Sequence, residues 1–242
     1  MMIWKSSVID KKLVWTAIKK PVLLMSVVFL LWTIYRLYSF TGMEISVGDI
    51  CIKYRKPFLW LCIALPLLMI SVSAANDHYY RLYILIRLDS RHEIIRNIIN
   101  TDVSCCLLFA MIPVIGLAAI CAFKGYSGPD VIIMLILMFV QQTVLFFLIS
   151  CIVGTVAAIC RKKLIGIVVI YAAILLTDAI GAYFNCHGLN FLLAGLNISI
   201  LEVMQGMTLS AIKCILPCMA LSIAAIFLLK KIVYAIDLVS LG

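Results

Sequence analysis

The sequence predicts an all-α integral membrane protein with six transmembrane helices. Of its 242 residues 65% are hydrophobic and only 13% are charged, and the mean hydropathy is +1.18. Soluble domains carry about 25% charged residues, so a soluble fold is excluded. Six apolar runs have about the 20 residues that a helix needs to cross a hydrocarbon core about 30 Å thick. Basic residues gather at the ends of these runs, as is usual for membrane spans.

The six spans are predicted from uninterrupted apolar runs. Their bounds are Val22–Phe40, Phe58–Ala75, Val103–Phe123, Val131–Cys160, Leu164–Phe184 and Ala211–Leu229. The fourth is longer than a membrane requires, so we expect it to bend near Gly154 or to project from the bilayer. Pro66, Pro113 and Pro217 lie inside the second, third and sixth spans and predict kinks there.

The basic residues predict the orientation of the chain. Most of the 20 lysines and arginines lie in the N-terminal arm, the second and fourth connections, and the C-terminal tail. These four segments are on one side of a six-span protein, and the positive-inside rule places that side, with both termini, in the cytoplasm. The net charge of +9 therefore serves orientation and lipid headgroup contact. We expect no nucleic acid partner.

Two further segments are predicted to lie at the membrane surfaces. Residues 7–20 mix apolar residues with lysines, which is typical of a helix on the inner surface. Residues 186–210, between the fifth and sixth spans, are apolar but interrupted by three glycines. Their apolar stretches are too short to span, so they predict short re-entrant helices in the outer leaflet. Such broken helices are tolerated only against protein or a water-filled cavity.

The most informative connection is residues 79–100, between the second and third spans. Its arginines stand among tyrosines, leucines and isoleucines, which predicts a basic amphipathic element on the inner face. Ser90 and Glu93 have the spacing of a capping box, so we expect a helix to restart at Arg91. Residues 79–88 are expected to extend the second span inward. An interfacial helix with its arginines on lipid phosphates is the alternative.

No motif predicts catalysis, cofactor binding or metal binding by this chain. It has no P-loop, no His-Glu-x-x-His and no Gly-x-Ser-x-Gly. Most of the ten cysteines lie within or at the ends of apolar runs, where they act as small buried hydrophobes. Cys51 and Cys186 lie in predicted outer loops, which leaves a disulfide between them open.

Three polar residues inside the spans are candidates for a translocation path. Gln141 and Gln142 are near the middle of the fourth span, and at least one must face protein because adjacent helical residues point about 100° apart. Asp178 lies in the outer half of the fifth span. Interhelical hydrogen bonding for the glutamines and a basic partner for Asp178 are the structural alternatives. An intramembrane enzyme using Asp178 would need a second catalytic group, and none is evident.

The order of these elements resembles the permease subunits of type-2 ABC transporters, which include bacterial exporters and immunity transporters for peptides, bacteriocins and antibiotics. The stretch Ile84–Arg96 (ILIRLDSRHEIIR) is similar to one in small permeases of this group. There an Arg-x-x-Ser-Arg pattern, here Arg87, Ser90 and Arg91, precedes a helix and the third span. The usual aromatic residue after the second arginine is replaced by isoleucine.

The resemblance implies a permease that is not itself an enzyme. Two copies, or two related permeases, would form the pathway in a bacterial cytoplasmic membrane. Separate P-loop ATPase subunits, which carry ATP and magnesium, would drive it through a coupling helix between the second and third spans. The coupling residues that it implies are Arg87, Ser90, Arg91, Glu93, Ile94 and Arg96.

Two functions are therefore expected. The first is a permease subunit that exports a peptide or other amphipathic substrate, because an apolar bundle with few intramembrane charges suits such a cargo better than a free ion. The alternative is a non-transporting membrane immunity or scaffold protein of a membrane complex. A neighbouring gene for a P-loop ATPase without spans would favour the first.

Overall fold

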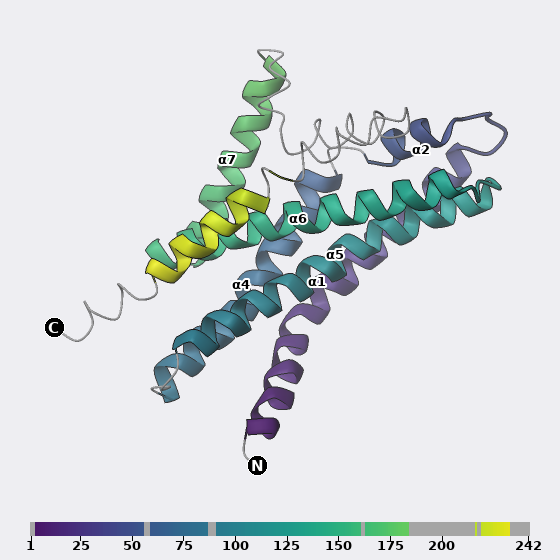
Figure 1. Cartoon of the computed structure of the whole chain (residues 1–242). Coiled ribbons are helices and arrows are strands. Elements are labelled where there is room, and N and C mark those ends of the chain that lie inside the picture. Colours follow the sequence, from purple (N-terminus) through teal and green to yellow (C-terminus); the bar gives the residue numbers. More distant parts are fainter. Residues whose placement is uncertain are drawn as a thin grey trace.

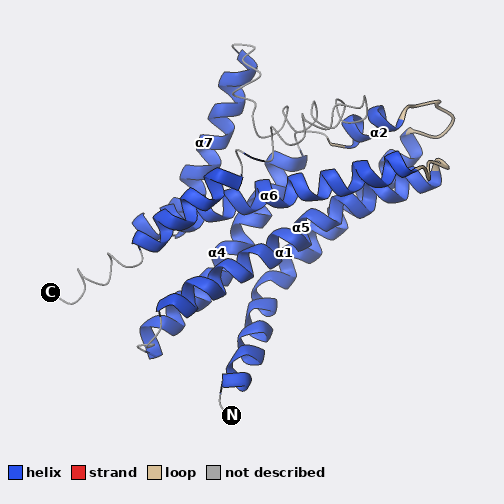
Figure 2. Ribbon diagram, viewed as in Figure 1, coloured by secondary structure: helices blue, strands red, loops and turns tan. Residues whose placement is uncertain are grey.

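The computed structural model describes residues 3–55, 59–86, 91–160, 163–183, 216 and 219–232. Within these ranges every regular element is helical and no strand occurs, which confirms the predicted class (Figure 2). The elements labelled in Figure 1, with the π-helical turn η1, are α1 (Ile3–Ser39), α2 (Val47–Tyr54), η1 (Trp60–Ala64), α4 (Leu65–Ile86), α5 (Arg91–Phe123), α6 (Pro129–Cys160) and α7 (Lys163–Tyr183). Residues 219–232 are also helical.

Three helical segments in the described part are long and apolar enough to cross a membrane. They are Trp15–Ser39, Ile95–Phe123 and Pro129–Val156, and they coincide with the first, third and fourth predicted spans. Two shorter apolar helices, Cys62–Asn76 and Leu164–Thr177, lie where the second and fifth spans are predicted. The chain is therefore membrane-embedded. The predicted re-entrant region, 186–210, lies outside the described residues, as does most of 211–218.

Two helices are longer than the predicted spans. The 37-residue α1 continues through Pro21, so the predicted interfacial helix and first span form one uninterrupted helix. The 33-residue α5 likewise joins the second half of the 79–100 connection to the third span. No glycine or proline occurs between Arg91 and Pro113, so nothing in the sequence stops helix propagation there.

Helices α1, α4, α5 and α6 pack into one bundle, and α7 packs mainly on α6 and diverges from the other helices (Figure 1). Helices α1 and α5 end, and α6 begins, near α2 (Figure 1); we call this the α2 end. Helix α5 begins at the opposite end, which we call the Arg91 end. The chain thus crosses the bundle in alternating directions.

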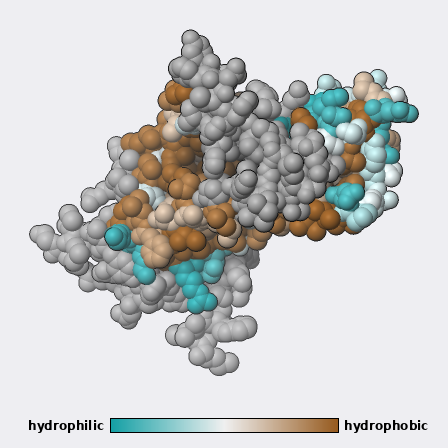
Figure 3. Space-filling view, turned by 45° about the horizontal axis from the view of Figure 1, so that its top comes forward, coloured by the Kyte–Doolittle hydropathy of each residue, from teal (hydrophilic) through white to brown (hydrophobic). Residues whose placement is uncertain are grey.

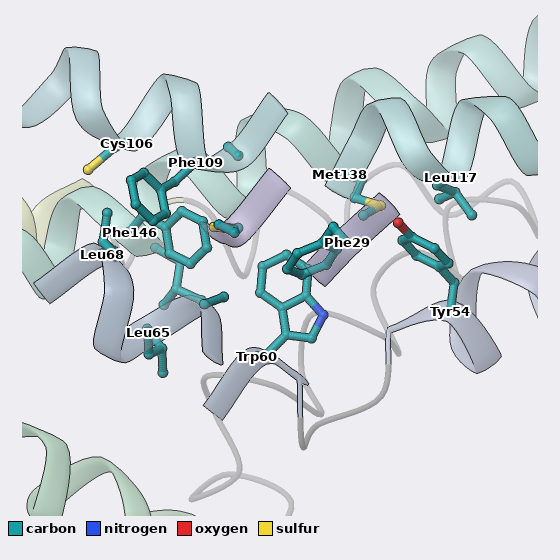
Figure 4. Close-up of a cluster of buried hydrophobic side chains, with 14 of the residues drawn as sticks. Phe29, Tyr54, Trp60, Leu65, Leu68, Cys106, Phe109, Leu117, Met138 and Phe146 are labelled. Atoms are coloured by element: carbon teal, nitrogen blue, oxygen red, sulfur yellow. The ribbon is translucent and has the colours of Figure 1, made fainter. Parts of the chain in front are cut away.

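Within the hydrophobic core of the bundle, Trp60 packs against aromatic rings of two other helices (Figure 4). Its ring centroid is 5.8 Å from that of Phe29 in α1, in an edge-on arrangement, and 5.7 Å from that of Phe146 in α6. Such pairs add about 0.5–1.5 kcal/mol each beyond the burial of their area. Trp60 therefore fixes η1 between α1 and α6.

The outside of the bundle is also apolar. Figure 3 shows hydrophobic atoms along the middle of the molecule, with hydrophilic atoms gathered at the right of the view and at its lower left. Large side chains such as Leu23 of α1 and Leu164 of α7 are mostly exposed. A helix that is apolar all round is typical of a membrane interior. This surface therefore suits lipid contact, or contact with another membrane helix.

Side-chain hydrogen bonds connect the turns at the α2 end. Lys124, just after α5, donates hydrogen bonds from Nζ to the carbonyl oxygens of Phe40 and Met43. The hydroxyl of Tyr126 donates to the carbonyl oxygen of Ile45 at 2.5 Å. Lys124 and Tyr126 both lie in the turn between α5 and α6. Their hydrogen bonds therefore hold this turn against the segment between α1 and α2.

Helix α2 folds back onto the bundle. The Ser46 hydroxyl caps its first turn by accepting from the backbone N–H of Asp49 at 3.2 Å. The indole Nε1 of Trp32 in α1 donates to the carbonyl oxygen of Tyr54 at 2.9 Å. Cys51 is buried here as a free thiol, so the structure has no disulfide at that cysteine.

Candidate functional site

The predicted coupling segment lies at the Arg91 end, where two helices approach one connection. Helix α4 continues to Ile86, in agreement with the predicted inward extension of the second span. Helix α5 begins at Arg91 within the described residues; because residues 87–90 are not described, the predicted helix restart there stays a prediction. Arg87 and Ser90 fall outside the described residues. The capping contact of Ser90 therefore stays a prediction.

The first turns of α5 have a buried side and an exposed side. Ile95 and Ile98 are buried, three residues apart, whereas Arg96 is exposed. The backbones of Arg91, Glu93 and Ile94 are helical, but their side chains lie outside the described part. Among the six predicted coupling residues, Arg96 is thus the one whose side chain the structure places. It lies on the side that faces away from the isoleucines.

Both glutamines of α6 lie inside the bundle. Gln141 and Gln142 are almost fully buried, which exceeds the minimum of one that helix geometry requires. Neither Nε2 nor Oε1 of Gln142 has a hydrogen-bond partner in the part of the chain that is described. Unpaired amides are costly in an apolar interior. Gln142 therefore has hydrogen-bonding capacity that the described residues do not use.

The third candidate of the translocation path is Asp178. Its backbone belongs to α7, five residues before the helix ends at Tyr183. Its side chain lies outside the described residues. Whether Asp178 approaches Gln141 and Gln142, and whether it has a role, therefore stays a prediction.

A polar cluster that the sequence did not predict joins three helices. The carboxyl group of Asp102 in α5 lies near the side chains of Ser150 in α6 and Asn76 in α4. The exposed fractions are 3% for Asp102, 2% for Ser150 and 5% for Asn76. We call these residues the three-helix polar cluster. It lies toward the Arg91 end, about 9 Å along α5 from Arg96 at 1.5 Å per residue.

The hydrogen bonding of this cluster is incomplete. Oδ1 of Asp102, Oδ1 of Asn76 and Oγ of Ser150 are buried without a hydrogen-bond partner among the described residues. A partly satisfied polar network is sensitive to small displacements, because a buried polar atom without a partner costs free energy. A small displacement of α5 relative to α4 and α6 would therefore change the free energy of their packing at this cluster.

The sequence held a weak signal for this cluster. Asn76 comes directly after the predicted second span, and Asp102 comes directly before the predicted third. Both positions are typical of residues at a membrane surface. Because consecutive spans run in opposite directions, two residues at their inner ends face one another. Ser150 gave no separate signal, since serine is common in spans.

The described residues hold no group of three or more His, Cys, Asp or Glu side chains that could bind a metal ion. No protein-family model, no curated protein and no solved structure matches the chain.

Proposed function

We propose that this chain is the membrane-spanning permease subunit of an ATP-driven ABC exporter that moves a peptide or other amphipathic substrate. It would lie in a bacterial cytoplasmic membrane with both termini inside. A separate P-loop ATPase would bind ATP and magnesium, and a second copy or a related permease would complete the pathway. The observation that supports this most is the continuity of the predicted coupling segment with a membrane-length helix, α5.

Continuity matters because a helix transmits displacement along its axis. At about 1.5 Å per residue, the 33 residues of α5 extend about 50 Å. An ATPase that moves the exposed side of the first turns, where Arg96 lies, would displace the whole N-terminal part of α5. Ile95 and Ile98 couple this part to the bundle through buried contacts. A loop in place of the helix would absorb the movement.

The three-helix polar cluster is a buried polar contact that such a movement would reach. A displacement of Asp102 changes its distance to both Asn76 of α4 and Ser150 of α6. Packed interfaces of this kind tend to have discrete arrangements rather than a continuous range. The cluster would therefore help to convert ATPase closure into two positions of α5, as alternating access requires.

The proposed substrate contacts are the three polar residues of the predicted translocation path. Gln142 has the most support, because both polar atoms of its amide lack a partner within the described part of the chain. Gln141 is its neighbour on α6. Asp178 is retained from the sequence pattern alone. In the proposed transporter, rearrangement of α5 and α6 would open these positions to the pathway.

The proposal is tested by isolating the tagged chain from its native membranes in a mild detergent. We expect a P-loop ATPase without membrane spans to co-purify in an equimolar amount, together with magnesium-dependent ATP hydrolysis at the same elution position. Isolation of the chain without any ATPase and without ATP turnover would contradict the proposal. That outcome would favour the non-transporting immunity or scaffold protein.

A further inference from the structure

Two arginines are buried near the α2 end. Arg36, near the end of α1, is 9% exposed, and Arg55, directly after α2, is 4% exposed. The guanidinium carbon of Arg36 lies 4.2 Å from the centre of the Trp32 ring. That of Arg55 lies 5.7 Å from the centre of the Trp60 ring. Each cation is thus held beside an indole ring.

Neither arginine has a counter-charge in the described part of the chain. The titratable groups that act electrostatically on these arginines are Tyr35 for Arg36 and Cys51 for Arg55. Neither group is a carboxylate. Burial raises the pKa of the Cys51 thiol, so Cys51 stays neutral and offers no negative charge. Burial also lowers the pKa of Arg55, yet an arginine stays protonated at any physiological pH.

The unpaired atoms near Arg55 are all hydrogen-bond donors. NH1 of Arg55 and the indole Nε1 of Trp60 are buried without an acceptor among the described residues, and so is Nε of Arg36. Figure 4 shows the indole nitrogen of Trp60 on the side of its ring toward Tyr54, the residue before Arg55. An aromatic face attracts a cation but accepts no guanidinium hydrogen bond of ordinary strength. The neighbourhood therefore has donors and positive charge, and it lacks an anionic acceptor.

The backbone is also unusual at this place. Trp60 begins η1, a single π-helical turn that leads into α4. Such turns are rare and frequently lie at functional sites. Here the turn positions Trp60 between Phe29 and Phe146, so the ring that faces Arg55 is held rigidly by α1 and α6.

We propose that Arg55 and Trp60 form a binding site for an anionic oxygen group, a phosphate or a carboxylate. Guanidinium binds such groups through a fork of parallel N–H donors, and the indole N–H of Trp60 adds one more. Arg36 adds positive charge at the same end of the bundle. The group could belong to the headgroup of an anionic lipid or to a soluble molecule. The site does not depend on an ATPase, so it is separate from the proposed transport function.

The test uses the purified full chain in a neutral detergent and measures its thermal unfolding midpoint. Three probes are added in separate titrations: phosphatidylglycerol in mixed micelles, inorganic phosphate, and acetate. Phosphatidylcholine is the uncharged reference. Ligand that binds only the folded chain raises the midpoint in a saturable way. We expect at least one anionic probe to do so. Phosphatidylglycerol alone would identify a lipid headgroup, and phosphate or acetate a soluble anion.

The variants distinguish a built site from general attraction to a basic protein. Arg55→Gln removes the charge and should weaken the apparent affinity about tenfold or more, as expected for a charged hydrogen bond. Lys53→Gln is the matched control, because Lys53 is an exposed cation of the same helix and its loss should leave the affinity unchanged. Trp60→Phe keeps a ring and removes the N–H, so it tests the site even if Arg55→Gln does not fold.

The proposal is overturned by either of two results. One is a wild-type midpoint that responds to none of the anionic probes beyond the response to phosphatidylcholine. The other is an equal loss of affinity in Lys53→Gln and Arg55→Gln, or in Lys53→Gln and Trp60→Phe if Arg55→Gln is unfolded, which would show attraction to net charge alone.

Discussion

The hydroxyl group of Tyr54 lies against the backbone of Gly116, in the space that a side chain at position 116 would occupy. The same hydroxyl is 3.1 Å from Oγ1 of Thr33. Three elements, α2, α5 and α1, therefore meet at one buried contact (Figure 4 labels Tyr54). This contact fastens the α2 end of α5, while the proposed coupling segment is at its other end.

The first prediction concerns the space at Gly116. A methyl group at this position would overlap the Tyr54 hydroxyl and lie 2.5 Å from Oγ1 of Thr33, so Gly116→Ala must displace α2 or α5. We expect a loss of about 1–3 kcal/mol in unfolding free energy, the usual cost of overpacking. Thermal unfolding of the purified chain in detergent measures it.

The control for this variant is Gly154→Ala in α6. No atom lies within 4 Å of a methyl group at Gly154, so this variant should be neutral or up to about 1 kcal/mol more stable through helix propensity. Equal midpoints for the two variants would show that the contact between Tyr54 and Gly116 is not tight.

The second prediction concerns the ionisation of Tyr54. Burial raises its pKa from 10.0 to about 12, against a smaller opposite effect of the hydrogen bond with Thr33. Because the folded pKa is the higher one, the neutral hydroxyl stabilises the fold fully below pH 10. This contribution is lost as the pH rises through about 12.

Absorbance of tyrosinate near 295 nm measures this titration. The difference between the wild-type chain and Tyr54→Phe should titrate near pH 12 as long as the protein is folded. A difference that titrates near pH 10 would mean that the Tyr54 hydroxyl is in contact with water.

The third prediction concerns Asp102. Asp102→Leu leaves Asn76 and Ser150 without the carboxyl group that they contact, and it should lower the unfolding free energy by about 1–3 kcal/mol. Asp102→Asn keeps the shape and the hydrogen-bonding atoms, so it should cost less than Asp102→Leu. Asp130→Asn, at an exposed carboxylate of α6, is the control and should change nothing.

A double-mutant cycle between Asp102→Leu and Ser150→Ala separates contact from general damage. Residues that interact directly have coupling energies of about 0.5 kcal/mol or more. If the two changes in unfolding free energy simply add, the carboxyl group of Asp102 and the hydroxyl group of Ser150 do not interact. The three-helix polar cluster would then not couple α5 to α6.

The sequence predicted those features that depend on local pattern. The helical class follows from the long apolar runs, and the helical conformation of residues 91–100 agrees with the spaced isoleucines there. The break expected before Val22 did not occur in the structure. Pro21 removes a single backbone hydrogen bond, so a helix with good helix formers on both sides can continue through it.

The features that depend on contacts between distant segments were not predicted. Asp102, Asn76 and Ser150 meet because of the angles at which α4, α5 and α6 pack, and no spacing in the sequence encodes those angles. Helix α2 was read as part of an outer loop. Its local signal was present, since Ser46 and Asp49 precede Ile50 and Tyr54 in the manner of a helix cap. Its position against Gly116 was not evident from the sequence.

The central claim is that the Arg91 end of α5 couples this chain to an ATPase. The most direct measurement is ATP turnover by the isolated complex carrying Arg96→Glu, with Lys20→Glu as the control because Lys20 is an exposed cation of α1. We predict a loss of about tenfold or more in turnover, or release of the ATPase, for Arg96→Glu alone. Unchanged turnover for Arg96→Glu, and for a variant that also carries Arg87→Glu and Arg91→Glu, would contradict the coupling role.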